Sequence, residues 1–338
     1  MRSFIINEPR HGCLEEIPAP VPAEGEVLVE VRAAGLCGTD IHIYNGEYFG
    51  GYPRIPGHEF SGVVAALGPK ASKFPVGARV SADPNIFCES CGACKANRQN
   101  FCAEMEAVGV TRHGAFAQFL TVPERCVFDI GDMPFSEAAL LEPLSCVVYG
   151  QEQTGVPLGC DALIFGAGPI GLLHAQLAAV NGAASVTVVD LYEHKLALAR
   201  ELGVSRAYLA AEFAGMKQKG YSLVIDCTGV PAVVENAVRY VADAGTLLMF
   251  GVCPQGGAIK VDPYEVFRRE LRLMGTFALK KVFGKALALA KSGKIKLDRL
   301  IDKPLALEEA PEFFKNISRA GNSGMKALFY PNQGSANN

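Results

Sequence analysis

The sequence predicts an α/β protein with two domains, one β-rich and one built on a doubly wound parallel sheet. Three observations support this prediction. Residues 1 to about 135 hold short strands separated by turn residues, which is typical of a β-rich, barrel-like domain. From about 151 to 275 strands and helices alternate, which is typical of a parallel sheet covered by helices. The 338 residues also exceed the usual size of a single hydrophobic core.

The first part of the chain contains four runs of strand-forming residues bounded by Gly and Pro. They predict strands at 3–6, 26–31, 62–67 and 117–122. A helical stretch follows at 136–150, and Ser136 is its expected N-cap.

The second part alternates between the two periodicities. The expected strands are 162–165, 185–189, 223–226 and 246–250, and the expected helices are 170–180, 193–202 and 232–241. Right-handed crossovers place the carboxyl ends of such strands along one ligand crevice. For the tail we expect helices at 281–291 and 308–317, a strand at 325–330, and a disordered end at 332–338.

The composition excludes several classes of function. With 49% hydrophobic and 20% charged residues, the chain is typical of a soluble globular protein. Its net charge of -3 provides no basic surface, so we expect neither nucleic acid nor membrane as a partner. The first apolar run is too short for a signal peptide, and we expect a cytoplasmic protein. The eleven Cys are then metal ligands or reduced thiols rather than disulfides.

A glycine-rich stretch at 165–171 lies where a buried strand turns into a helix. A dinucleotide-binding turn needs glycines in this context, for a tight bend, for close approach of a pyrophosphate and for packing of helix on strand. Asp190 ends the next strand, within the roughly 20 residues expected for the acid that hydrogen-bonds the adenosine ribose. Asp190 therefore favours NAD over NADP. The expected cofactor-binding residues are Gly166, Gly168, Pro169, Ile170, Gly171 and Asp190.

Four cysteines share one short loop: Cys88, Cys91, Cys94 and Cys102. Four thiolates at this spacing can close a tetrahedron around zinc and leave no open position, which describes a structural site. An iron-sulfur cluster is the rival, because thiolates suit both. The bacterial cluster motif, however, has three residues before its last Cys, followed by Pro, where this chain has seven.

A second group of possible ligands combines Cys37 with His58 and Glu59. Thiolate, imidazole and carboxylate together are typical of a catalytic zinc site with room for water or substrate. Glu142, a carboxylate at an otherwise apolar helix start, is a further candidate ligand. Alternatively, Glu142 only stabilises the N-terminus of its helix through its negative charge.

With both ligand groups and the dinucleotide turn in this order, the whole chain resembles the zinc-dependent medium-chain alcohol dehydrogenases. Within them it is similar to the polyol branch typified by sorbitol dehydrogenase. The stretches that carry the resemblance are 35–40, 56–62, 88–102, 141–145 and 166–171. It implies a GroES-like catalytic domain at 1–150 and 278–338, a Rossmann domain at 151–277, an active site in the cleft, and a homodimer or homotetramer.

The resemblance also implies a role for each matched residue. Cys37, His58 and either Glu59 or Glu142 would hold one catalytic zinc, which lowers the pKa of a substrate hydroxyl. Glu59 matches a residue that moves in and out of the zinc's ligand shell.

Thr39 would take the substrate proton and His42 would pass it to water, while the nicotinamide accepts hydride. The aromatic side chains expected to line the substrate pocket are Tyr44, Tyr48, Phe49 and Phe277.

The substrate implied is a polyol with a secondary hydroxyl. The Arg-Tyr pair of sorbitol dehydrogenases is absent after Phe277, where Ala278 and Leu279 stand, which speaks against sorbitol itself. The string from Cys37 to Tyr44 also resembles L-threonine 3-dehydrogenase, and a sugar-acid dehydrogenase is a related possibility. Two rival classes are a zinc-free reductase of the quinone oxidoreductase kind and a catalytically silent protein that binds NAD and zinc.

Overall fold

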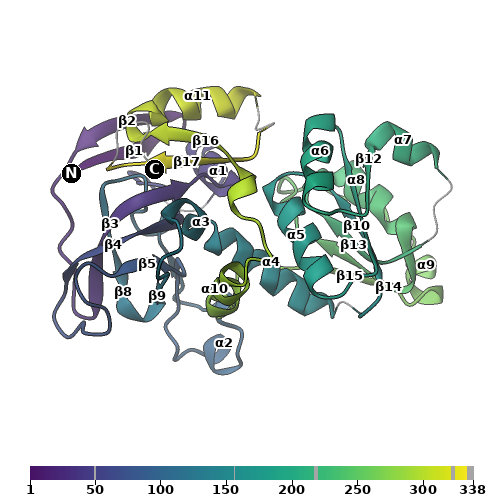
Figure 1. Cartoon of the computed structure of the whole chain (residues 1–338), viewed down its shortest axis with the longest axis horizontal. Coiled ribbons are helices and arrows are strands. Elements are labelled where there is room, and N and C mark those ends of the chain that lie inside the picture. Colours follow the sequence, from purple (N-terminus) through teal and green to yellow (C-terminus); the bar gives the residue numbers. More distant parts are fainter. Residues whose placement is uncertain (49–50, 156, 217–219, 321–323, 333–338) are drawn as a thin grey trace. The chain divides into compact units, whose positions relative to one another are not determined.

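The computed structural model describes residues 1–48, 51–155, 157–216, 220–320 and 324–332 (Figure 1). The chain forms two compact units. Unit 1 comprises Met1–Pro143, Lys280–Lys291 and Leu297–Asn338, and unit 2 comprises Leu144–Leu279 and Ser292–Lys296. The boundary expected at 150 lies within helix α4 (Leu141–Thr154), and the two units divide in the same helix, after Pro143. Phe49 lies outside the described residues.

Unit 2 is built on one parallel sheet of six strands in the order β12-β11-β10-β13-β14-β15. This order confirms the predicted doubly wound topology. The strands are β10 (Asp161–Phe165), β11 (Ser185–Asp190), β12 (Arg206–Leu209), β13 (Tyr221–Asp226), β14 (Val241–Met249) and β15 (Arg272–Gly275). The buried side chains of β10, β11, β13 and β14 are mostly Val, Ile and Leu, because helices bury both faces of such a sheet.

The helices of unit 2 pack against these strands. They are α5 (Pro169–Val180), α6 (Glu193–Glu201), α7 (Ala210–Gly215), α8 (Pro231–Ala237) and α9 (Pro263–Arg268). Helix α8 ends earlier than the sequence predicted. A 3-10 turn at Val238–Tyr240 follows, and Val241 already belongs to β14 through its pairing with Tyr221.

Unit 1 contains a sheet of seven strands ordered β16-β17-β3-β4-β5-β9, with β8 also paired to β3. Its strands are β3 (Glu26–Gly35), β4 (Glu59–Leu67), β5 (Arg79–Ala82), β8 (Phe119–Pro123), β9 (Val127–Asp129), β16 (Ile301–Ala306) and β17 (Lys326–Tyr330). Two small sheets join β1 (Arg2–Glu8) to β2 (His11–Glu16) and β6 (Asn85–Ile86) to β7 (Glu106–Ala107).

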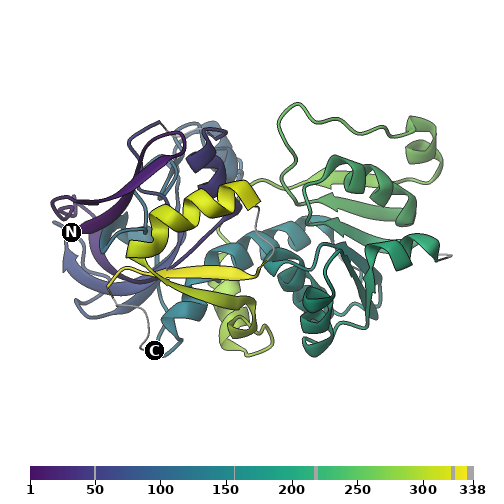
Figure 2. The same cartoon turned by 90° about the horizontal axis from the view of Figure 1, so that it is seen from above.

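The end of the chain completes the core of unit 1. In Figures 1 and 2 the last strand and α11 (Ala310–Ala320), in yellow, lie beside the purple N-terminal strands. The Phe314 ring of α11 lies 4.8 Å from the ring of Phe4, and the Phe329 ring of β17 lies 4.8 Å from that of Phe116. Four buried rings from three distant segments therefore fix the tail to the first 120 residues.

The helix predicted at 136–150 is two helices. Helix α3 (Phe135–Ala139) has Pro134 at its N-cap, so Ser136 is not a cap, and α4 begins at Leu141. The reason is Pro143, which has no N–H to donate to the carbonyl of Ala139 and whose ring would clash with it. Within the first turn of a new helix this proline is tolerated.

The remaining helices of unit 1 are α1 (Gly38–Asn45), α2 (Gly92–Lys95) and α10 (Phe283–Lys291). Over the described ranges no helix is both long and apolar enough to cross a membrane.

Candidate metal and dinucleotide sites

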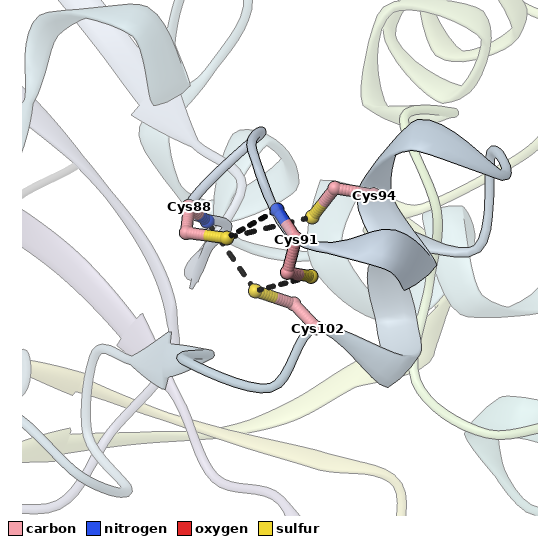
Figure 3. A group of neighbouring side chains, drawn as sticks. All are labelled: Cys88, Cys91, Cys94 and Cys102. Carbon is pink, nitrogen blue, oxygen red and sulfur yellow. Dashed lines mark hydrogen bonds between the residues drawn. The ribbon is translucent and has the colours of Figure 1, made fainter.

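The four cysteines of the loop converge in unit 1 (Figure 3). Their sulfur atoms all lie within 4.8 Å of one another, and two of the pairs, Cys88 with Cys94 and Cys91 with Cys102, are 4.0 Å apart. A tetrahedron with Zn–S distances of about 2.3 Å has edges of about 3.8 Å. The sulfur positions are therefore close to those of a four-coordinate zinc site.

Hydrogen-bond donors favour the thiolate form of Cys88, whereas burial raises the pKa of Cys94 to about 12. The amide of Cys91 donates to Cys88 Sγ and the amide of Cys88 donates to Cys102 Sγ, each at 3.3 Å (Figure 3). Hydrogen bonds from Ser90 and from the Cys91 amide lower the pKa of Cys88 to about 6. At least one thiolate is therefore available near neutral pH without metal, as a zinc site requires.

The second group brings together Cys37, His58 and Glu59, whose ligand atoms also lie within 4.8 Å of one another. Cys37 is the N-cap of α1, two residues after the end of β3, and Glu59 is the first residue of β4. Because β3 and β4 pair antiparallel with Gly35 opposite Glu59, the end of one strand meets the start of the other. Glu142 is 8% exposed and is not part of this set.

Asp40 organises two of these ligands and was missed in the sequence, although it stands inside the motif. Its carboxylate is fully buried and accepts hydrogen bonds from the amides of Cys37 (2.8 Å) and Gly57 (2.9 Å). Its Oδ1 lies 3.5 Å from Nδ1 of His58. With Nδ1 facing this carboxylate, Nε2 is the ring nitrogen left for a metal, which is the usual arrangement of a ligating histidine.

The two carboxylate oxygens of Glu59 have different surroundings. Oε1 accepts a hydrogen bond from the ammonium of Lys326, whereas Oε2 is buried and has no hydrogen-bond partner within the described part of the chain. A buried carboxylate oxygen without a donor is costly, and a metal ion would satisfy it. The donor set of thiolate, imidazole and this oxygen fits zinc.

Lys326 is the second residue that sequence reasoning missed. It is 6% exposed, and its Nζ also donates to the carbonyl of Leu36 at 3.0 Å. Burial by itself lowers the pKa of Lys326, but the acidic groups of Glu59, Cys37 and Glu142 outweigh burial and raise it. Burial likewise lowers the pKa of His58, yet Asp40 and Cys37 raise it well above its ordinary value. The pocket thus favours positive charge, as a cation site must.

The residues of the expected proton relay share one face of α1. Thr39 is partly exposed, and His42 follows three residues later, which places the two side chains on neighbouring turns. Nδ1 of His42 lies 2.7 Å from Oε2 of Glu47, and both side chains are about half exposed. An Nδ1–H that donates to Glu47 leaves Nε2 to accept a proton.

The aromatic residues expected at the substrate have different surroundings. Tyr44 is 4% exposed, its hydroxyl donates to the carbonyl of Arg10, and its ring packs 5.5 Å from Phe314 in the core. In the structure α1 turns Tyr44 inward against the core, and its substrate contact stays a prediction. Tyr48 and Phe277 are exposed, and they remain predictions.

The glycine turn of unit 2 has the geometry that its sequence predicted. Gly166 has φ +97°, which favours glycine, and a β-carbon on Gly171 would overlap with the carbonyl oxygen of Gly166. Gly168 is the N-cap of α5 and Pro169 occupies its first turn. The helix N-terminus therefore begins directly at the turn, as phosphate binding requires.

Asp190 lies beside this turn. Its Oδ2 accepts a hydrogen bond from the amide of Ala167 at 2.6 Å, and its Oδ1 accepts one from the amide of Tyr192 at 2.9 Å. A cavity of about 800 Å³ is lined by Phe165 and Val189, the residues that precede Gly166 and Asp190. The carboxylate is thus held at the carboxyl ends of two adjacent strands, β10 and β11, whereas the cavity itself is lined mainly by residues of α7 and α8.

Comparison with known families gives two matches. Residues 23–132 match the alcohol dehydrogenase GroES-like domain, and residues 169–292 match the zinc-binding dehydrogenase domain.

Three curated relatives cover nearly the whole chain. A D-altritol 5-dehydrogenase of Agrobacterium fabrum is 40% identical over 93% of this chain and 95% of its own length. D-arabinitol dehydrogenase 1 of Uromyces fabae is 32% identical over 98% and 97%. An L-threonine 3-dehydrogenase of Rhizobium rhizogenes is 30% identical over 96% and 97%.

Two solved structures have the same fold. A zinc-binding dehydrogenase from Sinorhizobium meliloti bound to NADP superposes with a TM-score of 0.94 at 33% identity, covering 98% of this chain and 99% of the other. An Escherichia coli alcohol dehydrogenase in complex with NADH superposes with a TM-score of 0.89 at 27% identity, with the same coverage.

Proposed function

The chain belongs to the zinc-dependent medium-chain alcohol dehydrogenases, in their polyol branch, and from this premise we propose that it oxidises a secondary hydroxyl of a sugar alcohol to a ketone with NAD. The observation that carries the proposal is the convergence of Cys37, His58 and Glu59 within 4.8 Å, in a chain that is 40% identical to an altritol dehydrogenase. The altritol and arabinitol dehydrogenases, at 40% and 32% identity, are more similar to this chain than the threonine dehydrogenase at 30%.

Each residue of unit 1 has a distinct part in this proposal. Cys37, His58 and Glu59 would hold one zinc, which supplies Lewis-acid chemistry at the substrate hydroxyl when bound. Asp40 would hold both ligands in place, because its carboxylate accepts a hydrogen bond from the amide of Cys37 and lies beside Nδ1 of His58. The four-cysteine loop would hold a second, structural zinc. Glu142 lies outside the ligand set, and we assign it to the charge balance around Lys326.

Two residues of α1 would remove the substrate proton. The hydroxyl of Thr39 accepts the substrate proton as it donates its own, and Nε2 of His42 takes the proton toward solvent. Glu47 supports this transfer by its position, because its carboxylate lies against Nδ1 of His42 and leaves Nε2 to receive the proton.

Unit 2 would bind the dinucleotide. The Gly166–Gly171 turn and the N-terminus of α5 receive the pyrophosphate, and Asp190 accepts hydrogen bonds from the adenosine ribose. The 2'-phosphate of NADP would meet the Asp190 carboxylate, so we propose NAD as the preferred cofactor.

The second candidate is oxidation of L-threonine, which the 30% identical relatives favour. The test is formation of NADH at 340 nm across four- to six-carbon polyols, sugar acids and L-threonine, with zinc content measured on the same sample. We expect turnover on one stereochemical set of polyols and two zinc ions per chain. Turnover on threonine alone would favour the threonine dehydrogenase instead, and no turnover with both zincs bound would indicate a catalytically silent binding protein.

Light scattering on the same sample tests the predicted homodimer or homotetramer.

A further inference from the structure

The buried ammonium of Lys326 lies beside the zinc ligands proposed above and has no part in that function. It reaches the site from the other end of the chain, because β17 pairs antiparallel with β3 and Leu328 lies opposite Gly35. Its two contacts are Oε1 of Glu59 and the carbonyl of Leu36, the neighbours in sequence of His58 and Cys37. A fully buried Lys is uncommon unless it is paired.

The ion pair of Lys326 and Glu59 affects the charge balance of the proposed zinc site. The thiolate of Cys37 and the carboxylate of Glu59 carry two negative charges, which match the two positive charges of a zinc ion. Lys326 adds a third positive charge in the same buried volume, which also holds the carboxylates of Asp40 and Glu142. In surroundings of low polarity, the ammonium and the metal share the Glu59 carboxylate and repel each other.

The contacts also determine how Glu59 faces the metal. Because Lys326 takes Oε1, only Oε2 is left without a hydrogen-bond partner among the described residues. The carboxylate is therefore presented through a single oxygen rather than through both.

We propose that Lys326 is a positioning residue whose positive charge limits Glu59 to one zinc-binding oxygen, weakens the hold of the site on zinc, and favours loss of the substrate's hydroxyl proton. The inference rests on the zinc site of the proposed function. It concerns the metal equilibrium first, so it can be tested without any substrate.

Three substitutions separate charge from hydrogen bonding. Lys326→Arg keeps the charge and the donors, Lys326→Gln keeps a donor but no charge, and Lys326→Met keeps neither. The matched control is Lys303→Met, an exposed lysine on the adjacent strand β16. Zinc affinity is measured by competition with a chromogenic chelator. The Cys37→Ser variant identifies which phase of zinc release belongs to this site.

We expect the Gln and Met variants to bind zinc at this site at least about tenfold more tightly than the wild type, a gain of about 1.4 kcal/mol. The Arg variant and the Lys303→Met control should match the wild type. In the Gln variant, the apparent pKa for kcat on the polyol should also move upward, because the site has lost a positive charge.

The opposite result would overturn the inference. If zinc affinity is unchanged or weaker in Lys326→Gln, the charge of Lys326 does not oppose the metal. If Lys326→Met fails to fold because Glu59 is left unpaired, the Gln variant alone decides. Absence of polyol turnover would overturn the proposed function but leave the zinc measurement intact, so the two failures are distinguishable.

Discussion

Gly35 faces Glu59 across β3 and β4, and a β-carbon on Gly35 would overlap with Oε2 of Glu59. That oxygen is the one without a hydrogen-bond partner in the described ranges. Because Gly35 has no side chain, there is space beside it for Oε2 of Glu59, the oxygen that would face the metal.

The first prediction follows from this relationship. Gly35→Ala should displace the Glu59 carboxylate and lower kcat at least tenfold, with weaker binding of one of the two zinc ions. Metal analysis after brief dialysis against a mild chelator measures the loss. Gly284→Ala is the control, because its added β-carbon meets only Phe128 at 3.6 Å. Full activity and zinc content in Gly35→Ala would show that Glu59 does not need this space.

The second prediction separates the two metal sites. Cys91→Ser should lose one zinc and unfold at a lower temperature, because the loop depends on four thiolates. His58→Ala should lose the other zinc, stay folded and lose activity at least about a thousandfold. Circular dichroism melts and zinc analysis on both variants decide. If both variants lose stability and activity equally, the assignment of one site as structural and the other as catalytic is wrong.

The third prediction concerns cofactor choice. Asp190→Ala should raise the KM for NAD about tenfold or more, because a charge-assisted hydrogen bond to the ribose is lost. The variant should also prefer NAD to NADP by a smaller ratio of kcat/KM than the wild type does. Glu193→Ala, a nearby exposed acid on α6, should leave both values unchanged. A wild-type protein that already prefers NADP would refute the assignment.

The fourth prediction concerns acid stability. His174 in α5 is fully buried, with Phe250 at 4.5 Å and Gln151 Nε2 donating to its carbonyl, and burial lowers its pKa to about 3. The folded protein holds the neutral ring, whereas the unfolded chain takes up a proton below pH 6.5. The stabilisation is therefore complete above pH 6.5 and decreases as the pH falls toward 3. Between pH 6.5 and 5 the loss is about 2 kcal/mol.

The variant that tests this is His174→Gln, which cannot be protonated. Its thermal midpoint should fall less than that of the wild type between pH 7.5 and pH 5. His194→Gln, on the exposed side of α6, serves as the control and should follow the wild type. Parallel curves for all three proteins would mean that His174 does not control acid stability.

The parts of the site that the sequence predicted are those that depend on short spacings. The four cysteines lie within one loop, and the glycine turn joins one strand to the next helix, so both constellations could be recognised locally. The same applies to Cys37 with His58 and Glu59, once two adjacent strands are expected.

What could not be predicted depends on contacts between distant segments. Glu59 and Lys326 are 267 residues apart, and no periodicity relates them. Asp40 stands in a motif that was noticed, but its role appears only when the amide of Gly57 and the ring of His58 lie beside it. Tyr44 was expected at the substrate because aromatic residues near glycines suit either role, and its packing against Phe314 could not be foreseen.

The pairing of β17 with β3 has a consequence for synthesis of the protein. Unit 1 begins to emerge from the ribosome first, yet its sheet lacks β16 and β17 until residues 301–330 have been made. Nearly all of unit 2 is continuous in sequence and can complete its sheet earlier. During translation residues 1–143 therefore cannot complete their sheet, and Glu59 has no ammonium from Lys326 to pair with, until the last strand has been made.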